Sequence, residues 1–198
     1  MTSIATLTGR VIDFLNPDPA QICLDDIAAG LKAMPRFTGQ TIRPWSVLQH
    51  SLLVAELAAP ENRLAALLHD ATEAYIADAS TPLKQAMREI INGLVTPRRS
   101  DYDYVEHRLW TAICARWDLS PDLPADVHEA DTDAMVIEAP RLQPKGWELP
   151  VWDHYRHRAV PAWGVDYFHQ LLGMGPSDCR SRWILDVATE LTKRRAAA

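Results

Sequence analysis

Cysteine is scarce in this chain. The three that occur, Cys23, Cys114 and Cys179, are widely separated and do not form a CxxC pattern. An odd number of scattered cysteines fits neither a disulfide framework nor a thiolate metal site. We therefore interpret them as small apolar side chains of a cytoplasmic protein, which would lie in the host cytoplasm if a phage encodes it.

Long apolar runs and an excess of positive charge are also absent. No stretch approaches the length of a membrane span, and the first residues lack the basic start and apolar core of a signal peptide. The formal net charge of -6 argues against a broad surface for a nucleic-acid polymer. We expect no membrane and no nucleic-acid polymer as a partner, although local Arg and Lys side chains can still bind a phosphorylated substrate.

Strand signals are rare, whereas helical periodicity recurs along the chain. The 198 residues, 47% of them hydrophobic, are enough for one packed domain, which we expect to span residues 1–198. A loose alternation around Gly9 indicates a short N-terminal β-hairpin, which Pro17 and Pro19 stop. The remainder predicts an all-α helical bundle. Its expected helices cover residues 24–34, 46–59, 63–75, 80–94, 101–117, 124–139, 161–172 and 177–195, and a loop or excursion covers 140–160.

Two histidines stand apart from the others because carboxylates accompany them on apolar helices. His69 is followed directly by Asp70, and His50 lies on the helix that Ser46 can cap. A lone histidine on an apolar face is more often a satisfied core side chain than a ligand. We keep that ordinary interpretation for the remaining five, which are His107, His128, His154, His157 and His169.

Asp70 follows two leucines at a helix position that we expect to be buried. An unpaired buried carboxylate is costly, so Asp70 requires a partner. A divalent cation is one candidate, and an arginine, Arg36 or Arg63, is the competing one. Asp131 can complete a cation's shell from a later helix, with Asp133 as its rival.

Two imidazoles and two carboxylates form a recognisable donor set. Mixed nitrogen and oxygen ligands suit Mn²⁺, Co²⁺, Zn²⁺ or Fe²⁺ better than Ca²⁺. Four protein ligands in an octahedral shell leave positions for water or a phosphate oxygen, which is an arrangement suited to hydrolysis. The residues therefore predict a hydrolytic metal site.

Three further side chains follow within one segment. Glu73 lies one turn beyond His69, where a carboxylate can orient or deprotonate water or protonate a leaving group; its alternative is a solvated surface residue. Asp78 lies just beyond this predicted helix, where it can also be an ordinary residue of a helix-ending turn. Lys84 follows the start of a predicted helix and can hold phosphate there, or it is an ordinary exposed lysine.

The order His50, His69-Asp70 and Asp131 resembles the HD-domain superfamily of metal-dependent phosphohydrolases, which are helical bundles. The string at 69–84, HDATEAYIADASTPLK, is similar to HD-type 5'-deoxynucleotidases and to small phage and bacterial dNTP triphosphohydrolases, including those specific for dATP. Residues 14–17, 26–28 and 36–39 look closer to the second group. The resemblance is dense over 7–84 and resumes at 131–138.

The resemblance assigns a role to each candidate residue. It implies that the matches of Glu73 and Asp78 act at the water or the leaving group, and that Lys84 binds phosphate. Arg36 and Phe37 match an Arg-aromatic pair at the sugar and phosphate that favours 2'-deoxy substrates. Two positions depart from the pattern, since relatives often carry Trp at Phe37 and His at Gln40. The implied metal ligands are His50, His69, Asp70 and Asp131.

These assignments predict a hydrolase of 2'-deoxynucleotides. We expect a dNTP, with dATP favoured, to give deoxynucleoside and triphosphate, with Mg²⁺ accompanying the triphosphate. Phe37 or Trp45 can pack against the sugar or base. One alternative is a 5'-deoxynucleotidase that releases phosphate from dNMP, and another is a non-catalytic nucleotide-binding regulator. Because relatives are oligomeric, we also expect a homo-oligomer, whose interface can include tryptophans that otherwise belong to the core, namely Trp110, Trp117, Trp147 and Trp152.

Overall fold

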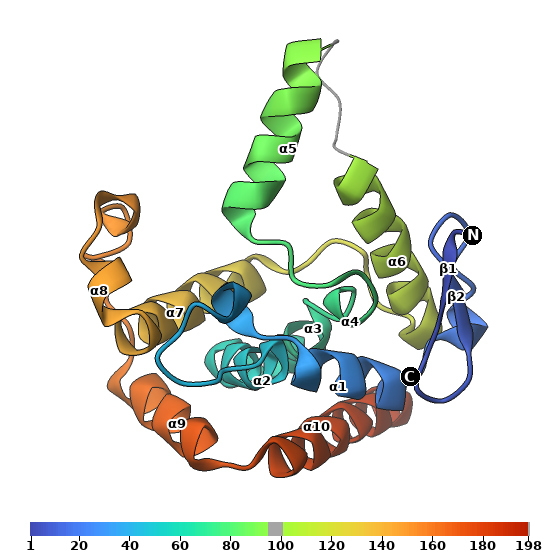
Figure 1. The fold of residues 1–198 in the computed structure, drawn as a ribbon. Coiled ribbons are helices and arrows are strands. Elements are labelled where there is room, and N and C mark those ends of the chain that lie inside the picture. The colour runs from blue at the N-terminus through green and yellow to red at the C-terminus, as the bar shows by residue number, and fades with distance from the viewer. Residues whose placement is uncertain (95–100, 198) are drawn as a thin grey trace.

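The computed structural model describes residues 1–94 and 101–197, and helices dominate this part of the chain (Figure 1). A two-stranded antiparallel sheet precedes them, formed by β1 (Ser3–Ala5) and β2 (Val11–Asp13) with Ile4 opposite Ile12. Gly9 lies in the connecting turn with a φ of 80°, a conformation that glycine adopts without strain. The predicted all-α class with a short N-terminal hairpin is therefore confirmed.

The helices follow the hairpin in chain order. Their bounds are α1 Leu24–Ala33, α2 Val47–Leu57, α3 Arg63–Leu68, α4 Glu73–Ile76, α5 Thr81–Leu94, α6 Asp101–Trp117, α7 Ala125–Leu142, α8 Pro144–Trp147, α9 Ala162–Gly173 and α10 Pro176–Ala197. A single 3-10 turn precedes α1 at Pro19–Gln21, and others lie between helices at Arg36–Gly39, Pro60–Asn62 and Pro150–Trp152. Among the described helices, none combines the length and the apolar character that crossing a membrane requires.

Helix α2 lies at the centre of the bundle. It packs against α1, α3, α7, α9 and α10, which surround it in Figure 1. Its sequence is apolar on almost every side, as expected for a helix enclosed by others. A capping box starts it, since the Ser46 side chain accepts from the Gln49 backbone while the Gln49 side chain bonds back to Ser46. His50 lies in the first turns of this helix and is completely buried.

The predicted helix over residues 63–75 is wrong in one respect, because it is broken in the middle. Helix α3 ends at Leu68, turns follow, and α4 begins at Glu73. Within the break, the Ala71 amide donates to the Leu68 carbonyl at 2.8 Å and the Glu73 amide to the Asp70 carbonyl at 3.0 Å. These tight i to i+3 bonds replace the α-helical ladder, so the backbone that carries the histidine-aspartate pair turns away from the helix axis.

Helix α7 extends further than predicted. It passes through Pro140 and ends at Leu142, and the segment that follows contains the short α8 and a 3-10 turn rather than a loop alone. Pro140 has no N–H to donate to the Val136 carbonyl four residues before it, and the helix continues for only two more residues. The Arg141 guanidinium folds back onto the same helix and donates to the Ile137 carbonyl at 2.7 Å.

Glycine is required where α1 crosses α4. A Cβ atom added at Gly30 would lie 2.7 Å from the Cα and the carbonyl oxygen of Ala74, which are backbone atoms that cannot rotate away. We expect Gly30→Ala to lower the free energy of unfolding by about 1–3 kcal/mol, the usual cost of overpacking. The steric cost would therefore exceed the roughly 1 kcal/mol of helix stability that replacing glycine by alanine adds.

Urea denaturation of the variant and of a matched control checks this prediction. Gly173, at the end of α9, has no atom within 4 Å of an added Cβ, so Gly173→Ala should be neutral or slightly stabilising. Equal midpoints for the two variants would contradict the close approach of α1 to α4.

Candidate metal centre

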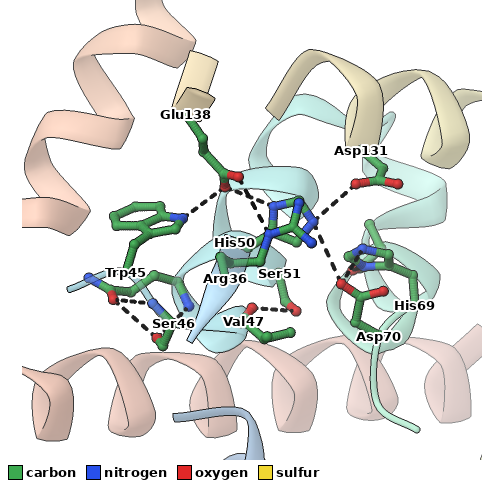
Figure 2. Close-up of polar contacts among 12 residues, drawn as sticks. Arg36, Trp45, Ser46, Val47, His50, Ser51, His69, Asp70, Asp131 and Glu138 are labelled. Atoms are coloured by element: carbon green, nitrogen blue, oxygen red, sulfur yellow. Dashed lines mark hydrogen bonds and ion pairs between the residues drawn. The ribbon is translucent and has the colours of Figure 1, made fainter. Parts of the chain in front are cut away.

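Four side chains from three parts of the chain converge beside α2, as Figure 2 shows. His50 comes from α2, His69 and Asp70 from the turns after α3, and Asp131 from α7. One ligand atom from each of His50, His69 and Asp131 lies within 4.8 Å of the others. The Asp70 carboxylate lies beside both imidazoles, with Oδ2 at 3.6 Å from His50 Nε2 and 3.2 Å from His69 Nε2. The structure thus brings together the four side chains that the sequence singled out.

Both imidazoles present the same nitrogen to this common space. His50 Nδ1 lies 2.8 Å from Glu138 Oε1, and His69 Nδ1 lies 2.7 Å from the carbonyl oxygen of Ala66. A carbonyl oxygen only accepts, so Nδ1 of His69 carries the proton and its Nε2 has a free lone pair. Both Nε2 atoms are buried without a hydrogen-bond partner. His50 Nε2 nevertheless lies 3.0 Å from Asp131 Oδ1, a spacing that a shared cation would explain.

Positive and negative groups alternate around the cluster, and each favours the charged form of its oppositely charged neighbours. Burial and the nearby Arg36 guanidinium disfavour charge on His50, but Glu138 and Asp131 together outweigh them and raise the pKa of His50 to about 10. Burial likewise disfavours charge on Asp70, but the imidazoles of His69 and His50 hold its pKa well below its usual value. The carboxylates that favour protonated imidazoles would also favour a divalent cation, whose binding requires the imidazoles to lose those protons.

An arginine is not the partner of Asp70 in the described structure. Arg63 forms its ion pair with Asp186 at 3.1 Å, on the side of α10. Arg36 approaches Glu138, with 3.6 Å between Nε and Oε2. Neither arginine thus forms a direct ion pair with Asp70, although the charge of Arg36 helps to lower the Asp70 pKa. The direct contacts of Asp70 are with the two imidazoles.

The structure also separates the two aspartates of α7. Asp131 faces His50, whereas Asp133 accepts a hydrogen bond from the Arg158 guanidinium at 2.5 Å. A carboxylate held by arginine is a poor candidate for metal coordination. The expected preference for Asp131 over Asp133 agrees with this geometry.

Glu73 is not a solvated surface residue, which is the alternative interpretation of its position in the sequence. It lies at the start of α4 and is only 5% exposed, and its Oε2 atom has no hydrogen-bond partner. Burial, together with the charges of Asp70 and Asp78, raises the pKa of Glu73 well above 4.5. Asp78 is half-buried, and its pKa is also raised, mainly by burial. A buried carboxyl group with a raised pKa is suited to proton transfer near neutral pH.

Two loops that carry predicted site residues have unusual backbone conformations. Ala77, which precedes Asp78, has φ 68° and ψ 160°. Phe37 and Thr38, which follow Arg36, have φ values of 54° and 52°. Positive φ at such residues costs on the order of 1–3 kcal/mol and is found where surrounding structure holds the chain in place, often at functional sites. Both loops are therefore constrained rather than free connections.

The predicted substrate-contacting residues have partners of their own. Lys84 is held by Glu106 at 2.8 Å and lies 5.2 Å from the centre of the Tyr102 ring, so it is not an ordinary exposed lysine. Phe37 packs edge-on against Trp152, with 6.4 Å between the centres of the two rings. Trp45 is only 2% exposed, so its predicted contact with a sugar or base is wrong, and it belongs to the core.

A cavity of about 540 Å³ reaches one member of the cluster, His69, from the side of α5 and α6. Its lining includes His69 and Thr72 at one end and Arg88, His107 and Trp110 on the two helices. This volume is within the range of pockets that hold small ligands. Trp110 is buried and also lines this cavity, which sequence reasoning did not predict.

Glu138 is the site residue that sequence reasoning missed. It is completely buried on α7, contacts His50, and lies on the same helix as Asp131. The signal was a single glutamate in the apolar run Met135–Ala139, since a charged residue in a buried stretch needs a partner.

Comparisons with other proteins place the chain among relatives whose names assign no activity. None of the known family models matches it. The chain is 38% identical over 149 residues to the uncharacterized protein RCAP_rcc00048 of Rhodobacter capsulatus. This match covers 69% of this chain and 70% of that protein. It is also 32% identical over 140 residues to the uncharacterized protein YfdR of Escherichia coli. This match covers 70% of this chain and 71% of YfdR. The chain belongs to the protein family that these two relatives represent.

Proposed function

We propose that this protein is an HD-type, metal-dependent phosphohydrolase that converts 2'-deoxynucleoside triphosphates, dATP foremost, to deoxynucleoside and triphosphate. One observation carries the proposal. Both Nε2 atoms, of His50 and His69, are buried, unpartnered and directed at carboxylates, while both Nδ1 atoms are engaged elsewhere. Two histidines oriented in this way, with Asp70 and Asp131 beside them, fit a divalent transition metal better than a purely structural cluster.

The donor set determines which chemistry the site would support. A bound Mn²⁺, Co²⁺, Zn²⁺ or Fe²⁺ would polarise the phosphate and lower the pKa of water. Water oxygen then forms a bond to the α-phosphorus, and the bond from that phosphorus to the 5' oxygen breaks. The 5' oxygen takes up a proton to give the deoxynucleoside. Glu73 is the leading group to move a proton in this reaction, with Asp78 as the second, because both carboxyl pKa values are raised.

Cationic groups near the cluster suit an anionic substrate. Arg36 is buried beside the site, and its charge interacts with Asp70, Asp131 and Glu73. Lys84 interacts electrostatically with Glu73 and Asp70, so its ammonium lies within reach of the same region. We assign these two cations to the phosphates, and Phe37 to the sugar side. Mg²⁺ would accompany the triphosphate in solution.

A nucleotide panel with product identification tests the proposal. Purified protein is incubated with dATP, dGTP, ATP or dAMP, with Mn²⁺ or Co²⁺ added, and products are separated by ion-exchange chromatography. We expect triphosphate and deoxynucleoside from dATP, and no products when a chelator replaces the metal. Activity confined to dAMP would identify a 5'-deoxynucleotidase instead. Binding of nucleotide and metal without any turnover would identify a regulator.

The ion pair between Lys84 and Glu106 gives a prediction on substrate affinity. A phosphate that binds Lys84 must compete with Glu106, which holds the ammonium at 2.8 Å in the absence of ligand. We expect Glu106→Gln to lower KM about two- to fivefold with kcat unchanged, because a partly exposed ion pair is worth about 0.2–1 kcal/mol.

Steady-state kinetics of a double-mutant cycle checks this effect. Lys84→Ala should raise KM, and the gain from Glu106→Gln should disappear when both substitutions are combined. A higher KM for Glu106→Gln alone would mean that Glu106 positions Lys84 rather than competes for it.

A further inference from the structure

Glu138 is a buried carboxylate that the proposed reaction does not use directly. Its side chain is completely inaccessible to solvent, and it lies on α7, four residues before that helix ends at Leu142. Burying a charged carboxylate without partners is strongly unfavourable, so its surroundings must offset that cost. The described contacts show which groups do so.

Each oxygen of Glu138 faces a different group of the site. Oε1 accepts a hydrogen bond from Trp45 Nε1 at 2.9 Å and lies 2.8 Å from His50 Nδ1. Oε2 lies 3.6 Å from Nε of Arg36. Figure 2 shows Glu138 above the His50 ring, on the side opposite to Asp131. One carboxylate thus contacts a candidate metal ligand, a candidate phosphate-binding arginine and a core indole.

The contact with Nδ1 determines what His50 can offer to a cation. An ionised carboxylate only accepts hydrogen bonds, so Nδ1 of His50 must carry a proton. In the neutral imidazole, the other nitrogen, Nε2, then has its lone pair free. Metal-ligating histidines commonly donate their second nitrogen to a carboxylate in this way, which fixes the ring orientation and increases its basicity. Trp45 anchors Oε1, so the carboxylate cannot turn away from the ring.

We propose that Glu138 is a positioning residue of the candidate metal centre, which holds the Nε2 atom of His50 toward the cation and keeps Arg36 beside it. The inference rests on the proposed function, because it assumes that the cluster binds a metal. It assigns to Glu138 no contact with substrate or with the reacting atoms. The alternative is that Glu138 only stabilises the fold by pairing with Arg36 and Trp45.

Metal affinity separates these two roles. Mn²⁺ alone is titrated into the full-length wild-type protein, Glu138→Gln and Glu138→Ala by isothermal titration calorimetry. We expect the Kd for Mn²⁺ to rise about tenfold for Glu138→Gln, which keeps an oxygen for Nδ1 but removes the charge, and about 100-fold for Glu138→Ala. If the alanine variant does not fold, the glutamine variant decides the question by the same measurement.

Asp26 provides a matched control. It is a buried carboxylate on α1 that accepts hydrogen bonds from the Thr8 amide at 2.9 Å and the Thr8 hydroxyl at 2.8 Å, away from the cluster. Asp26→Asn should lose thermal stability yet keep its Kd for Mn²⁺ within about twofold. A second readout is the ring tautomer of His50 in the Zn²⁺-loaded protein, followed by long-range ¹H–¹⁵N spectra. We expect the Nε2-coordinated, Nδ1–H form in the wild type and a smaller fraction of that form in Glu138→Ala at the same Zn²⁺ concentration.

The outcomes distinguish failure of this inference from failure of the proposed function. Kd values for Glu138→Gln and for a folded Glu138→Ala within about twofold of wild type would overturn the positioning role while leaving the metal centre intact. A wild-type protein that binds no Mn²⁺ would overturn both proposals. Weakened Mn²⁺ binding in the Glu138 variants, with no nucleotide hydrolysed by the wild type, would support the positioning role and overturn the phosphohydrolase.

Discussion

Replacing Asp131 by alanine is expected to remove divalent-metal binding and, with it, hydrolysis. Asp131 approaches His50 Nε2 at 3.0 Å, and its side chain is 45% exposed, so its loss leaves no large void in the core. Changes to residues behind the ligands already cost about 10–100-fold in metal affinity, so loss of a ligand should cost more than about 100-fold. Mn²⁺ titration and dATP hydrolysis measure the two effects.

Thermal unfolding supplies an independent measurement of the same prediction. A metal at about 100 times its Kd stabilises the folded state by about 2.7 kcal/mol, which corresponds to a shift in Tm of roughly 5–10 °C for a chain of this size. The shift should occur in the wild type and vanish in Asp131→Ala.

Asp133→Ala is the matched control for that variant. It removes the neighbouring carboxylate on the same helix, which pairs with Arg158 and not with the cluster. This variant should keep both the metal-induced shift in Tm and the activity. An equal loss of metal binding in Asp131→Ala and Asp133→Ala would show that the effect comes from damage to α7, and a normal affinity in Asp131→Ala would remove Asp131 from the site.

The second large effect is expected at Glu73. Glu73→Gln keeps the shape of the side chain but cannot exchange a proton, so kcat should fall by about 10²–10⁴-fold. The Kd for Mn²⁺ should stay close to that of the wild type, since Glu73 is not among the four candidate ligands. Single-turnover kinetics with dATP, together with Mn²⁺ titration, measures these quantities separately.

The same variant should be more stable than the wild type when no metal is bound. Burial raises the pKa of Glu73 above its unfolded value, so the folded state resists its ionisation. Stability associated with Glu73 is therefore fully present below about pH 4.5 and is lost as the pH rises through the raised pKa. Replacing this carboxyl by a neutral amide removes that loss.

Tm measurements from pH 4 to pH 8, with a chelator present, check the sign of this effect. The Tm of Glu73→Gln should exceed that of the wild type at pH 8, and the difference should shrink toward pH 4. Glu61→Gln, at an exposed glutamate, should follow the wild type throughout. A Glu73→Gln variant that is less stable than the wild type at pH 8 would contradict the raised pKa.

Local patterns were enough to predict most of the helices. The α6 helix agrees with its apolar spacing, and α2 begins where Ser46 caps it. The break between α3 and α4 was missed because residues 63–75 keep a helical apolar period throughout, while the tight turns at His69–Thr72 have no marker such as glycine or proline. The extension of α7 past Pro140 was missed because proline ordinarily marks a helix end.

The sequence by itself determined the all-α class and singled out His50, His69 and Asp70, with Asp131 or its rival Asp133, because apolar periodicity and the residue types along a helix are local properties. The tertiary structure alone decided that neither Arg36 nor Arg63 pairs with Asp70, that Lys84 is held by Glu106, and that Glu138 lies behind His50. These contacts join residues far apart along the chain, and several partners of suitable charge compete for each group. Only the packing of the helices selects one of them.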